Sequence, residues 1–225
     1  MIKKMLCVLT VCLMAAASAS AVPTVKVTHL SGYYSGNGGE FTLTPNDDLK
    51  DITAENGRFQ TFCIEKQEYI GIGVTYDVMV TTEAIGGGIN KGPKGPLGGD
   101  PLDPMTAYLY SEFRAGTLVG YNYTPGSDRV ASAGALQNVI WFIEDEASAT
   151  WASGSLGDIF YTAAQNSGWT DIGNVRVLNL YAQGHLGDKC YAKQDQLVLV
   201  PAPGAVLLAG IGIAFVGWIR RSRAM

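Results

Sequence analysis

The last 26 residues constrain this chain most, because they set its topology before any fold is considered. No Asp, Glu, Lys or Arg occurs over the 24 residues from Gln196 to Ile219, and an arginine cluster (220–225) follows directly. About 20 apolar residues are enough to cross a bilayer as a helix, and arginines after such a span prefer the cytoplasmic side. We therefore expect residues 204–219 to form a transmembrane helix that leaves the rest of the chain outside the membrane.

The N-terminus indicates export. A basic start and an apolar stretch precede small residues, Ala19-Ser20-Ala21. This order is that of a signal peptide, with cleavage expected between Ala21 and Val22. Removal of residues 1–21 would leave residues 22–199 as one domain, which is long enough to bury a core.

The C-terminal segment 200–225 resembles the PEP-CTERM sorting signal of bacteria that have an exosortase system. A proline motif, the apolar span and the basic tail follow in that order, although Ala202 stands where the family usually has Glu. The resemblance implies an exosortase-type membrane enzyme as partner, anchoring by the C-terminus before processing, and cell-surface or extracellular display afterwards. An ordinary tail anchor that is never cut is the alternative. The motif residues are Val200, Pro201, Pro203, Arg220 and Arg221.

Charge and composition exclude several functions for residues 22–199. The domain carries 20 acidic and 11 basic residues, a net charge of −9, which gives no electrostatic reason to bind nucleic acid. The whole sequence has two histidines, His29 and His185. It therefore offers few residues for a histidine-based zinc site or catalytic triad. We expect no metal, no cofactor and no catalytic turnover.

Hydrophobic periodicity predicts an α+β domain. Alternating or β-rich runs predict strands near residues 25–30, 41–44, 59–64 and 74–80, and again near 175–180 and 196–200. Seven Gly and four Pro between residues 86 and 104 predict a loop. Helical spacing predicts helices over about 104–115, from Ser127 or Asp128 to about 147, and over 156–166. Strands at both ends suggest a β-sandwich or barrel-like domain with a helical insert.

Two cysteines remain after export, Cys63 and Cys190. A disulfide between them is the default expectation for an exported protein. A buried free thiol at Cys63 is a second possibility.

Two segments suggest a third reading of Cys63. Cys63 lies in the run Phe62-Cys63-Ile64-Glu65, and Gln137 lies in Leu136-Gln137-Asn138-Val139-Ile140-Trp141. These segments resemble the thioester domains of bacterial surface adhesins, in which such a Cys and Gln condense to an internal thioester. The resemblance implies covalent attachment to an amine on a surface ligand, and the expected partner is such a ligand or an exopolysaccharide matrix. We therefore expect an envelope-displayed adhesion or matrix protein rather than an enzyme.

The apolar surroundings of Gln137 agree with an internal thioester. Gln137 shares an apolar helix face with Ala133, Ile140 and Trp141, and a buried amide costs about 1–3 kcal/mol unless it is hydrogen-bonded or consumed. A thioester persists only where water is excluded, and we expect Phe62 and Trp141 to form that pocket.

Two alternatives from other function classes stay open. Glu65, Glu68 and the run Glu144-Asp145-Glu146 contain carboxylates that a secreted polysaccharide hydrolase would use in pairs. A non-covalent surface binding domain with a Cys63–Cys190 disulfide is the other alternative.

Overall fold

A computed structural model describes residues 22–36, 38–85 and 93–201. Within these ranges, six strands form one antiparallel sheet in the order β3-β2-β1-β4-β7-β8. Its outer strands therefore come from the early and the late parts of the chain. The strands are β1 (Thr24–Thr28), β2 (Phe41–Pro45), β3 (Phe59–Thr61), β4 (Thr75–Thr81), β7 (Val175–Ala182) and β8 (Ala192–Leu199).

The alternation in the sequence explains how the strands bury one face. In β1, Val25 and Val27 are fully buried while Lys26 between them is exposed. Successive side chains of a strand point to opposite faces, and burying each Val or Leu contributes roughly 1.5–3 kcal/mol. The register follows from this pattern, with Val25 opposite Pro45 of β2 and opposite Tyr76 of β4.

The sheet curls until the segment after β3 meets β8. Leu197 N–H donates to the Phe62 carbonyl, and Ile64 N–H donates to the Asp195 carbonyl, each at 3.1 Å. Cys63 forms a bridge with Gln196 between these two bonds. Of the two expected architectures, the barrel-like one therefore describes the sheet, which is a curled half-barrel and not a sandwich of two packed sheets.

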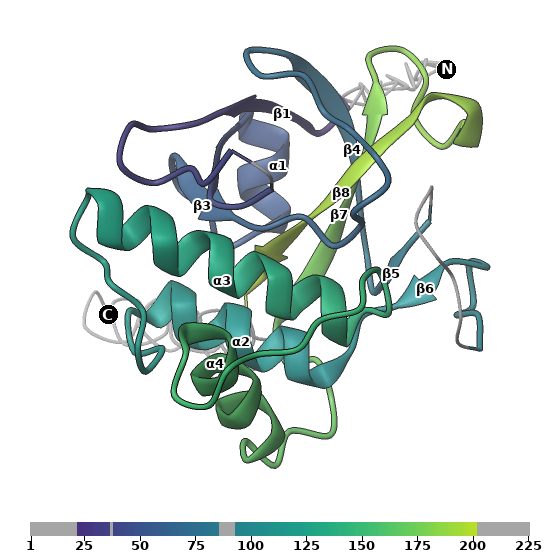
Figure 1. Ribbon diagram of the computed structural model, residues 1–225. Helices are drawn as coiled ribbons and strands as arrows, with labels where there is room; N and C mark the ends of the chain where they lie inside the picture. Colours follow the sequence, from purple (N-terminus) through teal and green to yellow (C-terminus); the bar gives the residue numbers. More distant parts are fainter. Residues whose placement is uncertain (1–21, 37, 86–92, 202–225) are drawn as a thin grey trace, which may run out of the picture.

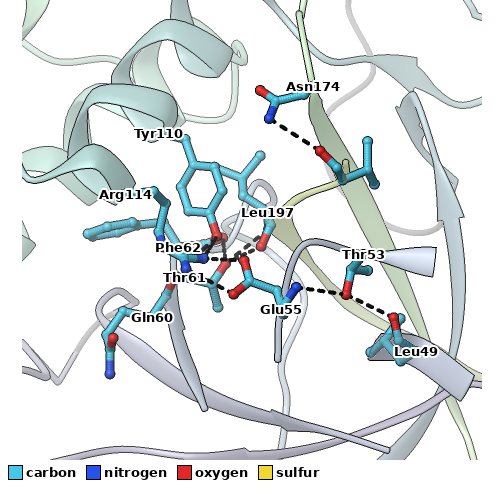
Figure 2. A network of polar contacts seen from close by, with 11 residues as sticks. Leu49, Thr53, Glu55, Gln60, Thr61, Phe62, Tyr110, Arg114, Asn174 and Leu197 are labelled. Atoms are coloured by element: carbon cyan, nitrogen blue, oxygen red, sulfur yellow. Dashed lines mark hydrogen bonds and ion pairs between the residues drawn. The ribbon is translucent and has the colours of Figure 1, made fainter. Parts of the chain in front are cut away.

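Side chains reinforce this seam. Figure 2 shows the Thr61 hydroxyl, which donates to the Leu197 carbonyl at 2.6 Å and accepts the Leu197 N–H at 3.1 Å. Next to it, Nη1 and Nη2 of Arg114 bind the Glu55 carboxylate, and Nη1 also contacts the Tyr110 hydroxyl. The helical insert is thereby tied to the chain just before β3.

The described residues contain four α-helices, three of which form the expected insert on one side of the sheet (Figure 1). Asp103 caps the first of these three through its side chain, and Gly116 ends it in a left-handed conformation at φ 77°. Ser155 caps the last. The helices are α1 (Asp47–Ile52), α2 (Pro104–Ala115), α3 (Ser127–Ile143) and α4 (Leu156–Gln165).

Several boundaries differ from the sequence prediction. The residue before α3 is Gly126, which has no side chain to cap it, so the helix starts at Ser127 without the expected Ser or Asp cap. Helix α1 was not expected, because six residues are too few for a visible period. The predicted Gly- and Pro-rich loop contains one short strand, β6 (Asp100–Pro101), which pairs with β5 (Glu83–Ala84).

No helix in the described ranges is both long and apolar enough to cross a bilayer. The expected transmembrane span 204–219 and the expected signal peptide lie outside these ranges.

Candidate functional site

Cys63 lies at the seam of the sheet, where the two ends of the fold meet. It lies two residues beyond the end of β3, is fully buried, and faces Gln196 across the closing bridge. Strand alternation sends the neighbouring Phe62 into the core cluster of the helices, whereas Cys63 packs in the cluster that contains Trp141. The local β pattern therefore presents the sulfur to one side and an aromatic ring to the other.

Gln137 reaches Cys63 from helix α3. The Gln137 side chain is fully buried, and its Oε1 lies 3.2 Å from Cys63 Sγ. Its Nε2 donates to the Cys63 carbonyl at 2.7 Å. The two residues are 74 positions apart in sequence, and the structure places them in the contact that the motif reading requires.

The Gln137 carbonyl oxygen accepts two backbone hydrogen bonds. Gly39 N–H donates to Oε1 at 2.9 Å and Cys63 N–H donates at 3.1 Å. These donors, and the acceptor opposite Nε2, fix which end of the amide is oxygen. Two N–H groups on one carbonyl oxygen form the arrangement that stabilises negative charge during attack at a carbonyl carbon. In Gln137 these two donors act on a carbonyl whose oxygen lies next to the Cys63 sulfur.

Two glycines make this approach possible. A Cβ on Gly39 would stand 2.2 Å from Phe62 Cδ1 and 3.0 Å from Gln137 Oε1. A Cβ on Gly38 would stand 2.7 Å from the Trp141 ring and 2.8 Å from Gln137 Cγ. The backbone of the Gly38–Gly39 segment can lie directly over the Gln137 side chain only because both residues lack a side chain.

A buried ion pair anchors this segment. Glu40, which follows Gly39, is fully buried and binds Arg129 of α3 through two hydrogen bonds, at 2.6 and 2.9 Å. The Tyr121 hydroxyl donates to the same carboxylate at 2.6 Å. Because Arg129 and Gln137 belong to one helix, the ion pair fixes the Gly39 N–H relative to the Gln137 carbonyl.

Of the two rings expected around the pair, Trp141 packs in the same cluster as Cys63, whereas Phe62 packs in the cluster of the helices. Phe62 is fully buried and stacks edge-to-face on Phe113 at 4.9 Å between ring centroids. Trp141 is 5% exposed. Its indole N–H makes no hydrogen bond of normal geometry within the described residues, yet it lies near enough to the Cys63 sulfur to influence its titration.

Burial raises the pKa of the Cys63 thiol well above its ordinary value. The N–H groups of Gly39 and Cys63 and the Trp141 indole oppose this rise, and the charge of Glu65 adds to it. Cys63 is accordingly protonated at neutral pH, so its reaction needs an acceptor for the thiol proton.

The alternative disulfide is not formed in this structure. Of the two cysteines within the described residues, Cys63 is buried and free, and Cys190 is exposed and free. Cys190 lies in the short 3₁₀ helix η1 (Lys189–Tyr191) just before β8.

Three of the acidic residues considered for a hydrolase, Glu65, Glu144 and Glu146, accept hydrogen bonds from backbone N–H groups. Glu144 accepts the Asp103 N–H, and burial raises the pKa of its carboxyl to about 8. Burial, together with Asp195 and Glu68, raises the pKa of Glu65 to about 10. No group of acidic, histidine or cysteine residues in the described part of the chain is arranged to hold a metal ion.

Few of the expected sorting residues fall within the described ranges. Val22 is half-exposed at the start of the domain. Val200 donates its N–H to the Asn174 carbonyl at 2.8 Å, and Pro201 is exposed. Ala21, Pro203, Arg220 and Arg221 lie outside the described residues.

Sequence reasoning missed the contribution of Gly39, Glu40, Tyr121 and Arg129. The Gly36-Asn37-Gly38-Gly39 run reads as an ordinary turn. The one available signal was a charged residue, Arg129, on the same helix as the apolar Gln137 face.

Comparison with known proteins adds one likeness. No protein-family model and no curated protein sequence matches the chain. Among solved structures, the chain is similar to the N-terminal thioester domain of a surface protein from Clostridium perfringens. The two share 13% sequence identity with a TM-score of 0.44, over 79% of this chain and 98% of that chain.

Proposed function

We propose that this domain carries an internal thioester between Cys63 and Gln137, through which it attaches covalently to a surface ligand. The observation that carries the proposal is the 3.2 Å contact between Cys63 Sγ and Gln137 Oε1, in a fully buried site where two N–H groups hold the carbonyl oxygen. A hydrogen bond alone would satisfy the amide, but the second donor and the adjacent thiol are what an acyl transfer needs.

Formation of the thioester balances without any other reagent. Cys63 Sγ attacks the Gln137 Cδ, the carbonyl oxygen takes up charge between the Gly39 and Cys63 N–H groups, and the amide nitrogen leaves as ammonia. The thiol proton passes to that nitrogen, which solves the problem of a thiol whose pKa is raised by burial. The product is an activated acyl group kept from water by Phe62 and Trp141.

In the reaction with a ligand, the Cys63 sulfur is the leaving group, whereas it is the nucleophile when the thioester forms. A primary amine attacks the same carbon, an amide bond forms, the carbon–sulfur bond breaks, and the proton lost from nitrogen leaves Cys63 as a thiol. The site is used once, since no step regenerates the thioester. The protein therefore acts as a covalent adhesion or matrix protein and not as an enzyme with turnover.

Display at the cell envelope completes the proposal. Residues 1–21 direct export, and residues 200–225 anchor the chain until an exosortase-type enzyme acts near the proline motif. These steps rest on the sequence pattern of the two ends.

Methylamine tests the proposal directly. We expect the full-length protein to incorporate one methylamine at Gln137 and to expose one new thiol at Cys63. Gln137→Ala and Cys63→Ala should each abolish incorporation. Cys190→Ser removes the exposed thiol and should leave incorporation unchanged. A wild-type protein that takes up no methylamine while folded would refute the thioester.

A further inference from the structure

A cavity of about 380 Å³ opens beside the Cys63–Gln137 pair. Sites for small molecules range from roughly 300 to 1,000 Å³, so this cavity suits one small group. Gly38 and Trp141 both line it, and Gly38 also lies against Gln137 Cγ. One glycine and one indole ring thus lie between the cavity and the Gln137 side chain, so an amine bound in the cavity is one layer of residues away from the acyl group.

Aromatic and amide side chains dominate the walls. Tyr34, Phe41, Tyr69 and Trp141 supply rings, and Asn138 and Gln194 supply amides. The Tyr69 side chain is 82% exposed, so its ring stands at the mouth and is available to a ligand. Aromatic faces pack against apolar C–H groups, while amides both donate and accept hydrogen bonds. This combination suits a ligand that has an apolar ring face and a rim of hydroxyl groups.

The charge of the walls argues against a lysine side chain. None of the described residues that line the cavity is acidic, and Lys66 is among them. Lys66 Nζ lies 5.6 Å from the centroid of the Trp141 ring, where a ligand ammonium would otherwise bind. The neighbouring carboxyl groups of Glu65 and Glu146 are buried and are not part of the lining.

A lysine amine has a pKa near 10.4 and would enter this cavity as a cation without a counter-ion. An amine on a sugar ring is less basic, because the oxygen atoms on neighbouring carbons withdraw electrons. More of it is neutral, and therefore nucleophilic, at neutral pH.

We propose that the cavity binds an amino sugar, whose primary amine takes the Gln137 acyl group from Cys63. The inference rests on the proposed thioester for its chemical step, but the sugar site itself exists without it. The amine nitrogen bonds to Gln137 Cδ, the carbon–sulfur bond breaks, and the displaced proton ends on the sulfur. The product is an amide between the protein and the sugar.

Kinetics with three probes test the chemical step. With a glucosamine disaccharide, we expect the rate at which the wild-type thioester is lost to level off as the disaccharide concentration rises, because binding precedes reaction. With methylamine or the side-chain amine of Nα-acetyl-lysine, the rate should rise linearly. Tyr69→Ala should slow the disaccharide reaction about ten-fold, as expected for a ten-fold loss of affinity. The methylamine rate of this variant should stay within about two-fold of the wild-type rate.

Val119→Ala is the matched control. Val119 is 71% exposed and does not line the cavity, so this variant should change neither rate. If methylamine reacts but the disaccharide shows no saturation and no dependence on Tyr69, the sugar site is refuted while the thioester stands. An equal reaction with the fully N-acetylated disaccharide would refute the amine as the attacking group.

Equilibrium binding separates the two proposals further. Cys63→Ala cannot form a thioester, but it keeps the cavity. We expect this variant to bind the glucosamine disaccharide in a calorimetric titration, and Cys63→Ala with Tyr69→Ala to lose that binding. Absence of binding to Cys63→Ala would overturn the sugar site whether or not the thioester forms.

Discussion

Gly39→Ala perturbs one of the two backbone donors to the Gln137 carbonyl oxygen. The new Cβ would meet Phe62 Cδ1 at 2.2 Å and Cε1 at 2.5 Å, far inside van der Waals contact. The conflict is steric, because Gly39 does not adopt a left-handed backbone. Relief requires the Gly39 segment to move away, which lengthens the 2.9 Å bond from Gly39 N–H to Gln137 Oε1.

The expected effects on stability and on reaction differ in size. Overpacking costs about 1–3 kcal/mol, and each kcal/mol lowers the Tm by about 2–4 °C for a domain of this length. Loss of one oxyanion-hole donor slows acyl transfer about 100- to 1,000-fold. We therefore expect a folded variant with little thioester, in which methylamine releases the remaining Cys63 thiol far more slowly.

The assay is the time course of thiol release after methylamine is added, with Tm measured on the same sample. Gly57→Ala is the control, because a Cβ there meets nothing within 4 Å and should change neither quantity. A folded Gly39→Ala protein that forms and loses its thioester at the wild-type rate would refute the role of the Gly39 N–H.

Two further predictions concern buried charges. Arg129→Met leaves the buried Glu40 carboxylate without its cation and should lower the free energy of unfolding by about 3–5 kcal/mol. Adding Glu40→Gln should recover part of that loss in denaturant titrations. No recovery would mean that the two side chains are not coupled. Glu65 keeps its proton in the folded state up to about pH 10, whereas the unfolded chain releases it near 4.5, so the folded state binds more protons and the free energy of unfolding falls as pH rises between these values. Glu65→Gln should therefore raise the Tm more at pH 9 than at pH 5, and an equal change at both values would contradict the raised pKa of Glu65.

Local patterns were enough to predict most of the secondary structure. The Asp103 cap and the Gly116 stop bound α2 as expected, and the alternation of Val25 and Val27 marks β1. The closure of the sheet was not predictable, because the Cys63–Gln196 bridge joins residues 133 positions apart and no local pattern encodes such a pairing. For that reason the sequence left the choice between sandwich and barrel open.

The candidate site, like the fold, was predictable from the sequence only in part. Cys63 and Gln137 carry their chemistry in their residue types, so motif reasoning found them. The Gly39 N–H is a backbone group, and its role depends on where the chain folds back over α3. Glu40 and Arg129 look like surface charges in the sequence and become a buried pair only in the folded domain.

The intact mass of the protein purified without its expected signal peptide, measured with and without alkylation of free thiols under denaturing conditions, tests the central claim most directly. A thioester lowers the mass by about 17 Da through loss of ammonia, and only Cys190 of the two cysteines in the mature domain is then alkylated. An amide between Gln137 and a lysine of the same chain would give the same mass loss but leave Cys63 open to alkylation. We expect the mass loss with Cys63 protected; an unshifted mass with both thiols alkylated, or a loss of about 2 Da from a disulfide, would contradict the thioester.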